Sequence, residues 1–396
     1  MRFYCGKIKE FCTAKQEILY LICFCLMLVS SCTGQKHEKT AESGNLSESE
    51  VNYAERFNLQ VTDSCTIVTI KNPWQGANGI SQRYYLVKKE KGTSIHADPS
   101  GIIYVPVKKI ICMSTTQLAM ISALNEIGSV AAVSGKGYVY NTEISERISA
   151  GIVKDVGYET GLNSELILKT DPDLVMMYGI GSESAGYTGK IEELGVKVMF
   201  NADYLENHPL GKAEWIKLFG ALYCKEKIAD SIFLSVAGSY NNIKDEIGRR
   251  AEKRPEVLLG LPYKDTWYIS PGNSYISRLI KDAGGDYLWE ETESPVSMPL
   301  GIEDVFIKSL KADFWLNIGN ITSKAEIVSL DPRLGMLPCF KNGNLYNNNR
   351  RINPTGGNDY WESGTIHPDI LLKDIATILN PGLFPEHELL YYRKIE

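Results

Sequence analysis

One short pattern occurs twice in this chain, once in each half. In the first half, Glu165 opens a short apolar stretch that leads through a polar break into the apolar run 174–177. In the second half, Glu303 opens a similar stretch that leads into the apolar run 314–316. Each copy predicts a helical turn that begins at a carboxylate and is followed by a buried strand. A unit present once in each half predicts two lobes built on one plan.

The segments around this repeat alternate between strand and helix patterns. Four apolar runs of strand length lie in the first half, at residues 109–113, 130–133, 174–178 and 196–200. Such alternation predicts parallel sheets whose faces are covered by helices. Between residues 225 and 253 the apolar residues recur at steps of three or four, which predicts one long amphipathic helix. Pro255 ends it, because the residue before a proline disfavours helical geometry, and a second α/β series begins at Val257.

Composition excludes some classes of partner. The chain has 396 residues, enough for two domains of ordinary size, and its 44% apolar and 23% charged content is that of a globular protein. A net charge of −6 without any basic run argues against a nucleic-acid partner.

The N-terminus has the pattern of an export signal. Four basic residues precede the apolar run 18–28, which is too short to span a bilayer and ends in Val29-Ser30-Ser31-Cys32. A cysteine in this position resembles the lipobox of bacterial lipoproteins, in which the cysteine is acylated. We therefore expect lipidation at Cys32, in preference to a plain secretory signal or an uncleaved anchor, and attachment to the membrane by acyl chains.

The residues after this signal predict a tether and a small extension. Residues 32–56 are polar and lack periodicity, which predicts a disordered tether. Two β-branched and aromatic runs, 65–70 and 83–87, flank the turn-rich segment 72–79 and predict a β-hairpin.

The cysteines beyond the signal do not predict a metal site. Cys65, Cys112, Cys224 and Cys339 are widely separated and lack zinc-ligand spacing. Export permits disulfides between them, whereas the apolar surroundings of Cys112 and Cys224 equally suit buried free thiols.

Several motifs, taken in order, resemble one known family. They are Asn163-x-Glu165, the segment 171–175 (Asp-Pro-Asp-Leu-Val), the long helix and Ala283-Gly284-Gly285. From about residue 108 to the C-terminus the chain resembles the substrate-binding proteins of ABC importers for ferric siderophores, haem and vitamin B12, the class III periplasmic binding proteins. The resemblance implies an α/β fold with two Rossmann-like lobes, one long rigid helix joining them and a ligand cleft between them.

With this resemblance, the chain divides into six expected segments. They are a lipoprotein signal peptide (1–31), a tether (32–56), an N-terminal hairpin extension (57–107), an N-terminal lobe (108–224), an interlobe helix (225–253) and a C-terminal lobe (254–396).

The repeated glutamates acquire a role from the resemblance. In that family one glutamate on each lobe docks onto arginines of the membrane permease, and Glu165 and Glu303 fall at the matching positions. Carboxylate–guanidinium pairs can be bidentate and fix orientation. A single acid in the first turn of a helix is also favoured by the helix dipole alone. The matched context of the two glutamates favours docking to an ABC permease.

The family binds its ligand through aromatic faces and a few polar groups. Candidate aromatic residues follow predicted strands or lie in glycine-rich loops: Tyr138, Tyr140, Tyr158, Tyr178, Trp267, Tyr268, Tyr360 and Trp361. Each taken alone suits core packing equally well, and as a set they favour a cleft. Arg350 and Arg351 suit the anionic groups of a chelate or, equally, a solvated turn.

These residues favour a monomeric binding protein that captures a ferric siderophore, with cobalamin or another cobamide, or haem, as alternatives. No cofactor is expected, and the five scattered histidines do not predict a bare metal site. An exported lipoprotein enzyme with Asp359 and Glu362 as acid and base groups is a further alternative, because fold alone does not decide function, although no nucleophile motif supports it. We expect a cell-envelope location facing the periplasm, or the cell surface if residues 35–38 act as an export signal.

Overall fold

The computed structural model describes residues 47–89, 101–158, 161–179 and 189–396, and residues 45–396 form one compact unit. The predicted signal peptide, Cys32 and the tether up to residue 46 lie outside the described residues. Within the described ranges, no helix is both apolar enough and long enough for a membrane span.

The N-terminal lobe contains a parallel five-stranded sheet in the order β10-β9-β6-β7-β8. Its strands are β6 (Ile110–Cys112), β7 (Val130–Val133), β8 (Lys154–Asp155), β9 (Leu174–Met177) and β10 (Val198–Phe200). Helices α2 (Thr115–Ala123), α3 (Thr142–Ser149), α4 (Ser164–Thr170), α6 (Pro209–Glu214) and α7 (Ile216–Leu222) belong to the same lobe. All residues of β6, β9 and β10 are buried, as in sheets that helices cover on both faces.

The C-terminal lobe repeats this plan. Its main sheet has the order β14-β11-β16-β17-β18, with only β18 antiparallel. The strands are β11 (Glu256–Leu259), β14 (Asp286–Tyr287), β16 (Phe314–Leu316), β17 (Leu345–Asn347) and β18 (Arg393–Lys394). A small antiparallel sheet is formed by β12 (Pro262–Tyr263), β13 (Thr266–Ile269) and β15 (Met298–Gly301). The helices are α9 (Tyr275–Asp282), α10 (Ile302–Ser309), α11 (Lys324–Leu330), α12 (Pro338–Lys341) and α13 (Pro368–Leu379).

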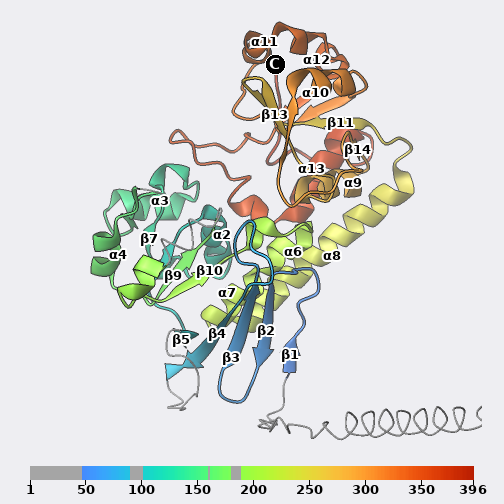
Figure 1. Ribbon diagram of the computed structural model, residues 1–396. Coiled ribbons are helices and arrows are strands. Elements are labelled where there is room, and N and C mark those ends of the chain that lie inside the picture. Colours follow the sequence, from blue (N-terminus) through green and yellow to red (C-terminus); the bar gives the residue numbers. More distant parts are fainter. Residues whose placement is uncertain (1–46, 90–100, 159–160, 180–188) are drawn as a thin grey trace, which may run out of the picture. The chain divides into compact units, whose positions relative to one another are not determined.

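A single long helix, α8 (Glu226–Arg250), connects the lobes. It packs on α7 of the N-terminal lobe and on α13 of the C-terminal lobe (Figure 1). The buried residues Ala229, Phe233, Val236, Tyr240 and Ile247 form its apolar face, as the spacing predicted. The two-lobe α/β fold expected from the sequence is confirmed, and its connecting helix is packed against both lobes.

The N-terminal extension is larger than the predicted hairpin. It is a five-stranded sheet of β1 (Ser47–Ser49), β2 (Phe57–Val61), β3 (Thr66–Lys71), β4 (Ser81–Lys88) and β5 (Ile102–Val105). The first four strands are antiparallel neighbours, and β5 is parallel to β4. The predicted hairpin is the β3–β4 pair. Strand β2 alternates buried and partly exposed residues, which is the period of a strand. The prediction of a tether followed by a hairpin did not include this strand.

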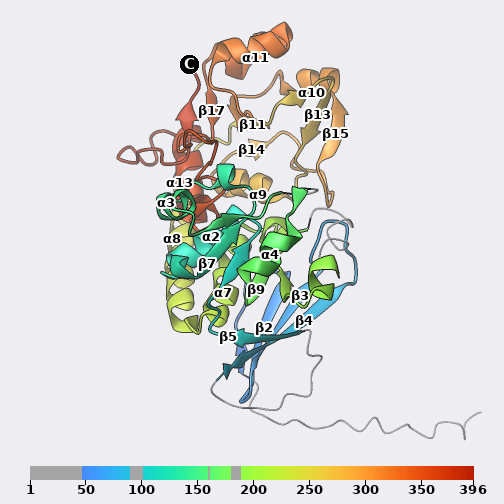
Figure 2. The same ribbon diagram turned by 90° about the vertical axis from the view of Figure 1, so that its left-hand side faces the viewer.

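The extension is part of the hydrophobic core. Figure 1 and Figure 2 both place β2 to β4 next to α7. Phe57 of β2 packs on Trp215 with ring centroids 4.7 Å apart, and both side chains are buried. The sheet therefore folds with the lobes.

Two buried carboxylates hold the segment that precedes β2. Glu214 accepts hydrogen bonds from the backbone N–H groups of Asn52, Tyr53 and Ala54 at 2.7–3.1 Å. Glu206 accepts those of Glu55 and Arg56, each at 3.0 Å. The predicted tether over 32–56 therefore differs from the structure in its last ten residues. These residues are mostly polar. Strand β2 pairs with the backbone of residues 47–49, and carboxylates distant in sequence bind the backbone of residues 52–56.

Close approach of the backbone accompanies these hydrogen bonds. A Cβ at Gly211 would lie 2.7 Å from the carbonyl oxygen of Tyr53. Only glycine therefore lets α6 come this close to the extension.

Glu214→Gln is expected to destabilise the whole unit. Glu214 is fully buried and pairs with the Lys217 ammonium at 2.9 Å, so the substitution leaves a buried charge without its partner. Removal of one partner of a buried pair costs about 3–5 kcal/mol. Denaturant unfolding measures this loss. Glu386→Gln, at an exposed position, is the control and should stay within about 0.5 kcal/mol of the wild type. Equal unfolding free energies for the two variants would contradict the role of Glu214.

Candidate ligand-binding site

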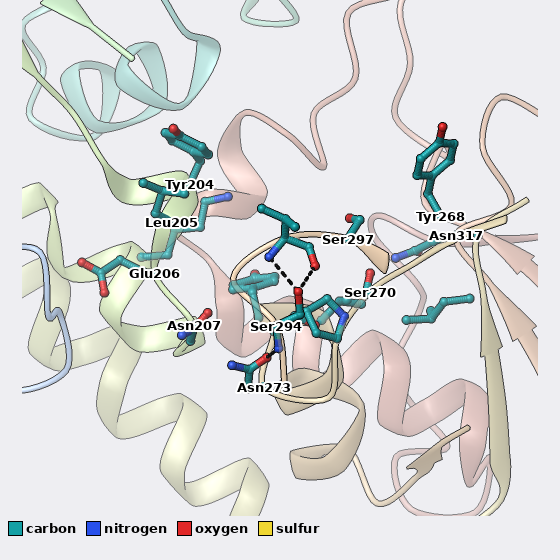
Figure 3. Close-up of a pocket in the computed structure, with 18 of the residues that line it drawn as sticks. Tyr204, Leu205, Glu206, Asn207, Tyr268, Ser270, Asn273, Ser294, Ser297 and Asn317 are labelled. Atoms are coloured by element: carbon teal, nitrogen blue, oxygen red, sulfur yellow. Dashed lines mark hydrogen bonds between the residues drawn. The ribbon is translucent and has the colours of Figure 1, made fainter. Parts of the chain in front are cut away.

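A cavity of about 930 Å³ lies where the extension and both lobes meet. Arg56 and Gln75 line it from the extension, Tyr204 to Asn207 and Lys212 line it from the N-terminal lobe, and loops of the C-terminal lobe supply the rest. Figure 3 shows Tyr204 and its neighbours on one side of the cavity, with Tyr268 and Asn317 on the other. This volume is in the range of sites that enclose small-molecule ligands.

The position of the cavity follows from the parallel sheets. The turn that carries Tyr204 follows β10, Gly260 follows β11, and Asn317 follows β16. In α/β sheets the carboxyl ends of parallel strands are where side chains gather and ligands bind. Here the strand ends of both lobes contribute to one cavity.

The lining is rich in aromatic rings and neutral hydrogen-bonding groups. The aromatic members are Tyr204, Tyr268, Tyr275, Tyr360 and Trp361. Side-chain amides come from Gln75, Asn207, Asn273, Asn317, Asn320, Asn348 and Asn358, and hydroxyls from Ser270, Ser274, Ser294 and Ser297. Amides and hydroxyls both donate and accept hydrogen bonds. The cavity therefore suits a large ligand that has both flat apolar surface and many polar groups.

Four charged side chains also line the cavity. Arg56 and Lys212 are cationic, and Glu206 and Glu293 are anionic. Burial raises the pKa of Glu206, whose carboxylate already accepts the indole N–H of Trp215 at 3.0 Å besides the backbone of the extension. Burial lowers the pKa of Lys212, and the charge of Asp203 partly opposes this effect.

Three of the predicted ligand residues line the cavity. Tyr268 and Trp361 are exposed, with 57% and 55% of their surface accessible. Tyr360 is 4% exposed and packs edge-on against Trp361, with centroids 4.7 Å apart. The backbone N–H of Tyr360 donates to the side-chain oxygen of Asn358 at 3.1 Å, so Tyr360 is bonded to one of the lining amides.

Three further predicted tyrosines form a row outside the cavity lining. The rings of Tyr138 and Tyr158 are 5.9 Å apart, and the hydroxyl of Tyr178 donates to that of Tyr158 at 3.1 Å. Tyr178 packs edge-on against Tyr204 at 6.3 Å. The row thus leads to the cavity through Tyr204, a residue that the sequence prediction missed. Tyr204 could have been predicted in the same way as the other tyrosines, because it follows shortly after a predicted strand.

Trp267 belongs to the core and is not among the described residues that line the cavity. It is fully buried, its indole N–H donates to the carbonyl of Leu259 at 3.0 Å, and its ring packs on Trp315. Side chains alternate between the faces of a strand. Since Tyr268 faces the cavity, its neighbour in β13 must face the core.

Arg350, Arg351 and Tyr140 are not among the described residues that line the cavity. The guanidinium of Arg351 pairs with Asp359 at 2.6 Å and lies 5.3 Å from the ring centre of Tyr140. Arg350 donates to the carbonyl of Leu389. Both arginines are engaged within the chain. They therefore give no support to the expectation that they bind the anionic groups of a chelate.

Glu362 bonds the two lobes together, whereas Asp359 pairs with Arg351 within the C-terminal lobe. The carboxylate of Glu362 accepts the backbone N–H groups of Tyr140 and Asn141 in the N-terminal lobe at 2.8 and 2.9 Å. Both acids are 3% exposed, and neither is among the described residues that line the cavity. Asn353 adds a hydrogen bond to the carbonyl of Val139 at 2.8 Å. The partners of Asp359 and Glu362 give no support to an acid–base pair at the cavity.

The two glutamates of the repeated unit lie on matching helices. Glu165 is exposed in the first turn of α4, which precedes β9, and Glu303 in the first turn of α10, which precedes β16. Glu303 has an exposed partner in its own chain, since its carboxylate lies 3.3 Å from the Arg333 guanidinium. Arg333 in turn pairs with Asp331 at 2.6 Å.

Metal-ligand clusters and disulfides are absent from the part of the chain that the structure describes. There, no three His, Cys, Asp or Glu side chains are grouped to hold a metal ion. Cys65, Cys112, Cys224 and Cys339 are free thiols, and burial raises the pKa of Cys112 and Cys339.

Comparison with known proteins agrees with this geometry. The family model described as periplasmic binding protein matches residues 110–349, more than half of the chain. The chain belongs to the periplasmic binding protein family. This periplasmic binding protein is 27% identical to a protein of Methanocaldococcus jannaschii named an uncharacterized lipoprotein, over 96% of each chain.

Solved structures show the same fold. A periplasmic heme binding protein from Pseudomonas aeruginosa aligns with a TM-score of 0.55 and 14% identity, covering 73% of this chain and 98% of that one. A structure described as an ABC-type Fe3+-hydroxamate transport system, from Saccharomonospora viridis, aligns with a TM-score of 0.52 and 18% identity, covering 69% and 94%.

The contact made by Glu362 predicts a pH dependence of stability. Burial raises the pKa of this carboxyl group to about 7, so the folded state holds its proton more tightly than the unfolded chain does. Its contribution is therefore complete at low pH and is lost as the pH rises from about 4.5 to about 7, by up to about 3 kcal/mol.

Glu362→Gln removes this titration, and its stability should fall less over the same pH interval. Unfolding free energies at several pH values measure the difference from the wild type. Glu388→Gln, at an exposed position, should keep the wild-type pH profile. Identical profiles for the wild type and Glu362→Gln would show that Glu362 does not titrate in this interval.

Proposed function

We propose that this protein is the substrate-binding component of an ABC importer and that its cargo is a metal chelate, with a ferric siderophore favoured. The observation that carries the proposal is the cavity of about 930 Å³ between the lobes, lined by aromatic rings and side-chain amides. A chelate presents flat or apolar ligand surface together with many oxygen atoms, which this lining complements. The proteins of similar fold that bind heme or serve Fe3+-hydroxamate transport support the same class of cargo.

Haem and cobamides are the alternatives within this proposal. The seven side-chain amides of the lining also suit the amide groups on the rim of a corrin. Titration of the purified protein with a ferric tris-hydroxamate, a ferric tris-catecholate, haemin and cyanocobalamin, followed by tryptophan fluorescence, separates them. Saturable binding of one ferric siderophore in preference to haemin and cyanocobalamin supports the favoured cargo. Binding of none of the four would overturn the proposal.

Catalysis is not part of the proposed function. The acids considered as an acid–base pair, Asp359 and Glu362, are engaged with Arg351 and with the backbone of the N-terminal lobe. The mechanism is capture between the lobes followed by delivery to the permease. A lipid anchor at Cys32 holds the protein in the cell envelope, on the periplasmic side, where the permease is reached.

Tyr268→Ala is expected to weaken chelate binding by about tenfold, because an aromatic contact contributes up to about 1.5 kcal/mol beyond buried area. The matched control is Tyr263→Ala. Tyr263 lies on the adjacent strand β12 and is also exposed, but it is not among the described residues that line the cavity. Fluorescence titration should give the control a wild-type dissociation constant. Equal affinities for the two variants would place the ligand elsewhere.

Docking to the permease is proposed to use Glu165 and Glu303. The double variant Glu165→Lys/Glu303→Lys should lose at least about tenfold in transport rate, since each charged hydrogen-bonded pair contributes about 1.5–3 kcal/mol. Its affinity for the chelate should be unchanged, because both residues lie outside the cavity lining. Transport into membrane vesicles containing the permease is the measurement.

The control for docking carries the same charge change at two other exposed positions, Glu143→Lys/Glu386→Lys. It should transport at the wild-type rate. A similar loss of transport in both double variants would indicate a general charge effect rather than docking.

A further inference from the structure

We propose that the N-terminal extension is part of the ligand site, and that Arg56 and Lys212 together form a cationic subsite for an anionic oxygen group of the ligand, such as a carboxylate or catecholate. This inference rests on the proposed function, since it specifies how the same cavity selects its cargo.

The attachment of the extension fixes where Arg56 lies. Its backbone N–H is the last of five successive groups bound by Glu214 and Glu206. Directly after it, Phe57 is buried against Trp215. The Cα of Arg56 is therefore held on both sides at the edge of the cavity.

The side chain of Arg56 is oriented by neutral acceptors. Its Nε donates to the carbonyl of Leu205 at 3.2 Å and its Nη1 to the carbonyl of Asn72 at 3.0 Å. Among the described residues, no carboxylate lies within ion-pair distance of this guanidinium. Carbonyl groups fix a guanidinium without neutralising its charge, so its remaining N–H groups are suited to a bidentate contact with an oxyanion.

Lys212 supplies a second positive charge to the same cavity. Its Nζ lies 5.3 Å from the centre of the Tyr275 ring, and within the described ranges no carboxylate pairs with it directly. A partly buried ammonium that rests on an aromatic face gains from an anion in the cavity.

Two carboxylates act on these charges, Glu206 on Arg56 and Asp203 on Lys212. Glu206 faces Arg56, but its two oxygens already accept two backbone N–H groups and the indole N–H of Trp215. Glu293 is exposed in a loop of the C-terminal lobe. Both cations of the cavity lining lie on the side where the extension meets the N-terminal lobe, so an anionic oxygen of the ligand finds its charged donors there.

A second part of the extension, the loop with Trp74 and Gln75, also lies at the cavity. The backbone N–H of Gln75 donates to the hydroxyl of Tyr204 at 3.2 Å and to the carbonyl of Gly179 at 3.2 Å. Trp74 packs on Phe200 with centroids 5.4 Å apart. These contacts place Gln75 next to Tyr204, so that residues of the extension lie along the cavity at two separate points.

The test compares ligands of different charge. An anionic ferric tris-catecholate and a neutral ferric tris-hydroxamate are titrated against the wild type, Arg56→Gln and Lys212→Gln. Each variant should weaken binding of the catecholate by about 10- to 100-fold, the range for hydrogen bonds to charged groups, and binding of the hydroxamate by less than about threefold. Arg83→Gln, an exposed arginine on β4 of the same extension, should bind both ligands as the wild type does.

A second variant separates charge from geometry. Arg56→Lys keeps the positive charge but lacks the two parallel N–H donors of a guanidinium. Its affinity for the catecholate should therefore lie between those of the wild type and Arg56→Gln. Thermal unfolding checks that every variant is folded. Unchanged catecholate binding in Arg56→Gln, or equal losses for both ligands, overturns the subsite.

Failure of the subsite can be told apart from failure of the proposed function. If the wild type binds neither chelate, and neither haemin nor cyanocobalamin, the proposed function fails, and citrate then tests the subsite alone. Stabilisation of the wild type by citrate in thermal unfolding, absent in Arg56→Gln, supports the subsite. Absence of stabilisation in the wild type as well overturns it.

Discussion

The packing of α8 against both lobes is the constraint on which the site depends. One face of this helix is buried against α7 and α13, and the hydroxyl of its Tyr240 donates to the buried Asp282 of α9 at 2.8 Å. A helix held at both ends sets the distance between the two sheets, so their strand ends face one shared cavity. At a second connection, Glu362 bonds the C-terminal lobe to the backbone of the N-terminal lobe. These two connections fix the positions of the lobes and thereby the size of the cavity between them.

The extension adds a third element to this two-lobe plan. It lies outside the stretch of the chain, residues 110–349, that matches the family model, yet its strands share the hydrophobic core. Its attachment is electrostatic as well as apolar, through two carboxylates that replace water around five backbone N–H groups. Such an arrangement resists solvent exchange because each buried carboxylate would be costly without its donors. The consequence for function is that residues of the extension stand beside those of the lobes in the cavity wall.

The sequence was sufficient for features that depend on periodicity and order. Alternating apolar runs predicted the parallel sheets, the three-to-four spacing predicted α8, and the repeated carboxylate unit predicted the matching pairs α4–β9 and α10–β16. It was insufficient where partners distant in sequence decide the structure. Strand β1 is Ser-Glu-Ser and has no apolar signal of its own, and it exists because β2 offers it backbone partners. The ordered segment 52–56 likewise depends on acids 150 or more positions away.

The candidate site shows the same division. Tyr268, Tyr360 and Trp361 were found because they follow strands or lie in a polar, aromatic loop. Trp267 was misjudged although strand alternation already separated it from Tyr268. Arg350 and Arg351 had the right charge, but sequence alone does not reveal that Asp359 and a carbonyl group engage them. Arg56 was hidden in a segment predicted to be a tether.

The central claim is that the cavity between the lobes holds a metal chelate without altering it. Native mass spectrometry of the purified protein, mixed with a ferric siderophore and then denatured, tests it most directly. The account predicts a one-to-one complex before denaturation and recovery of the intact ferric siderophore afterwards. Absence of a complex, or recovery of a chemically modified siderophore, would contradict it.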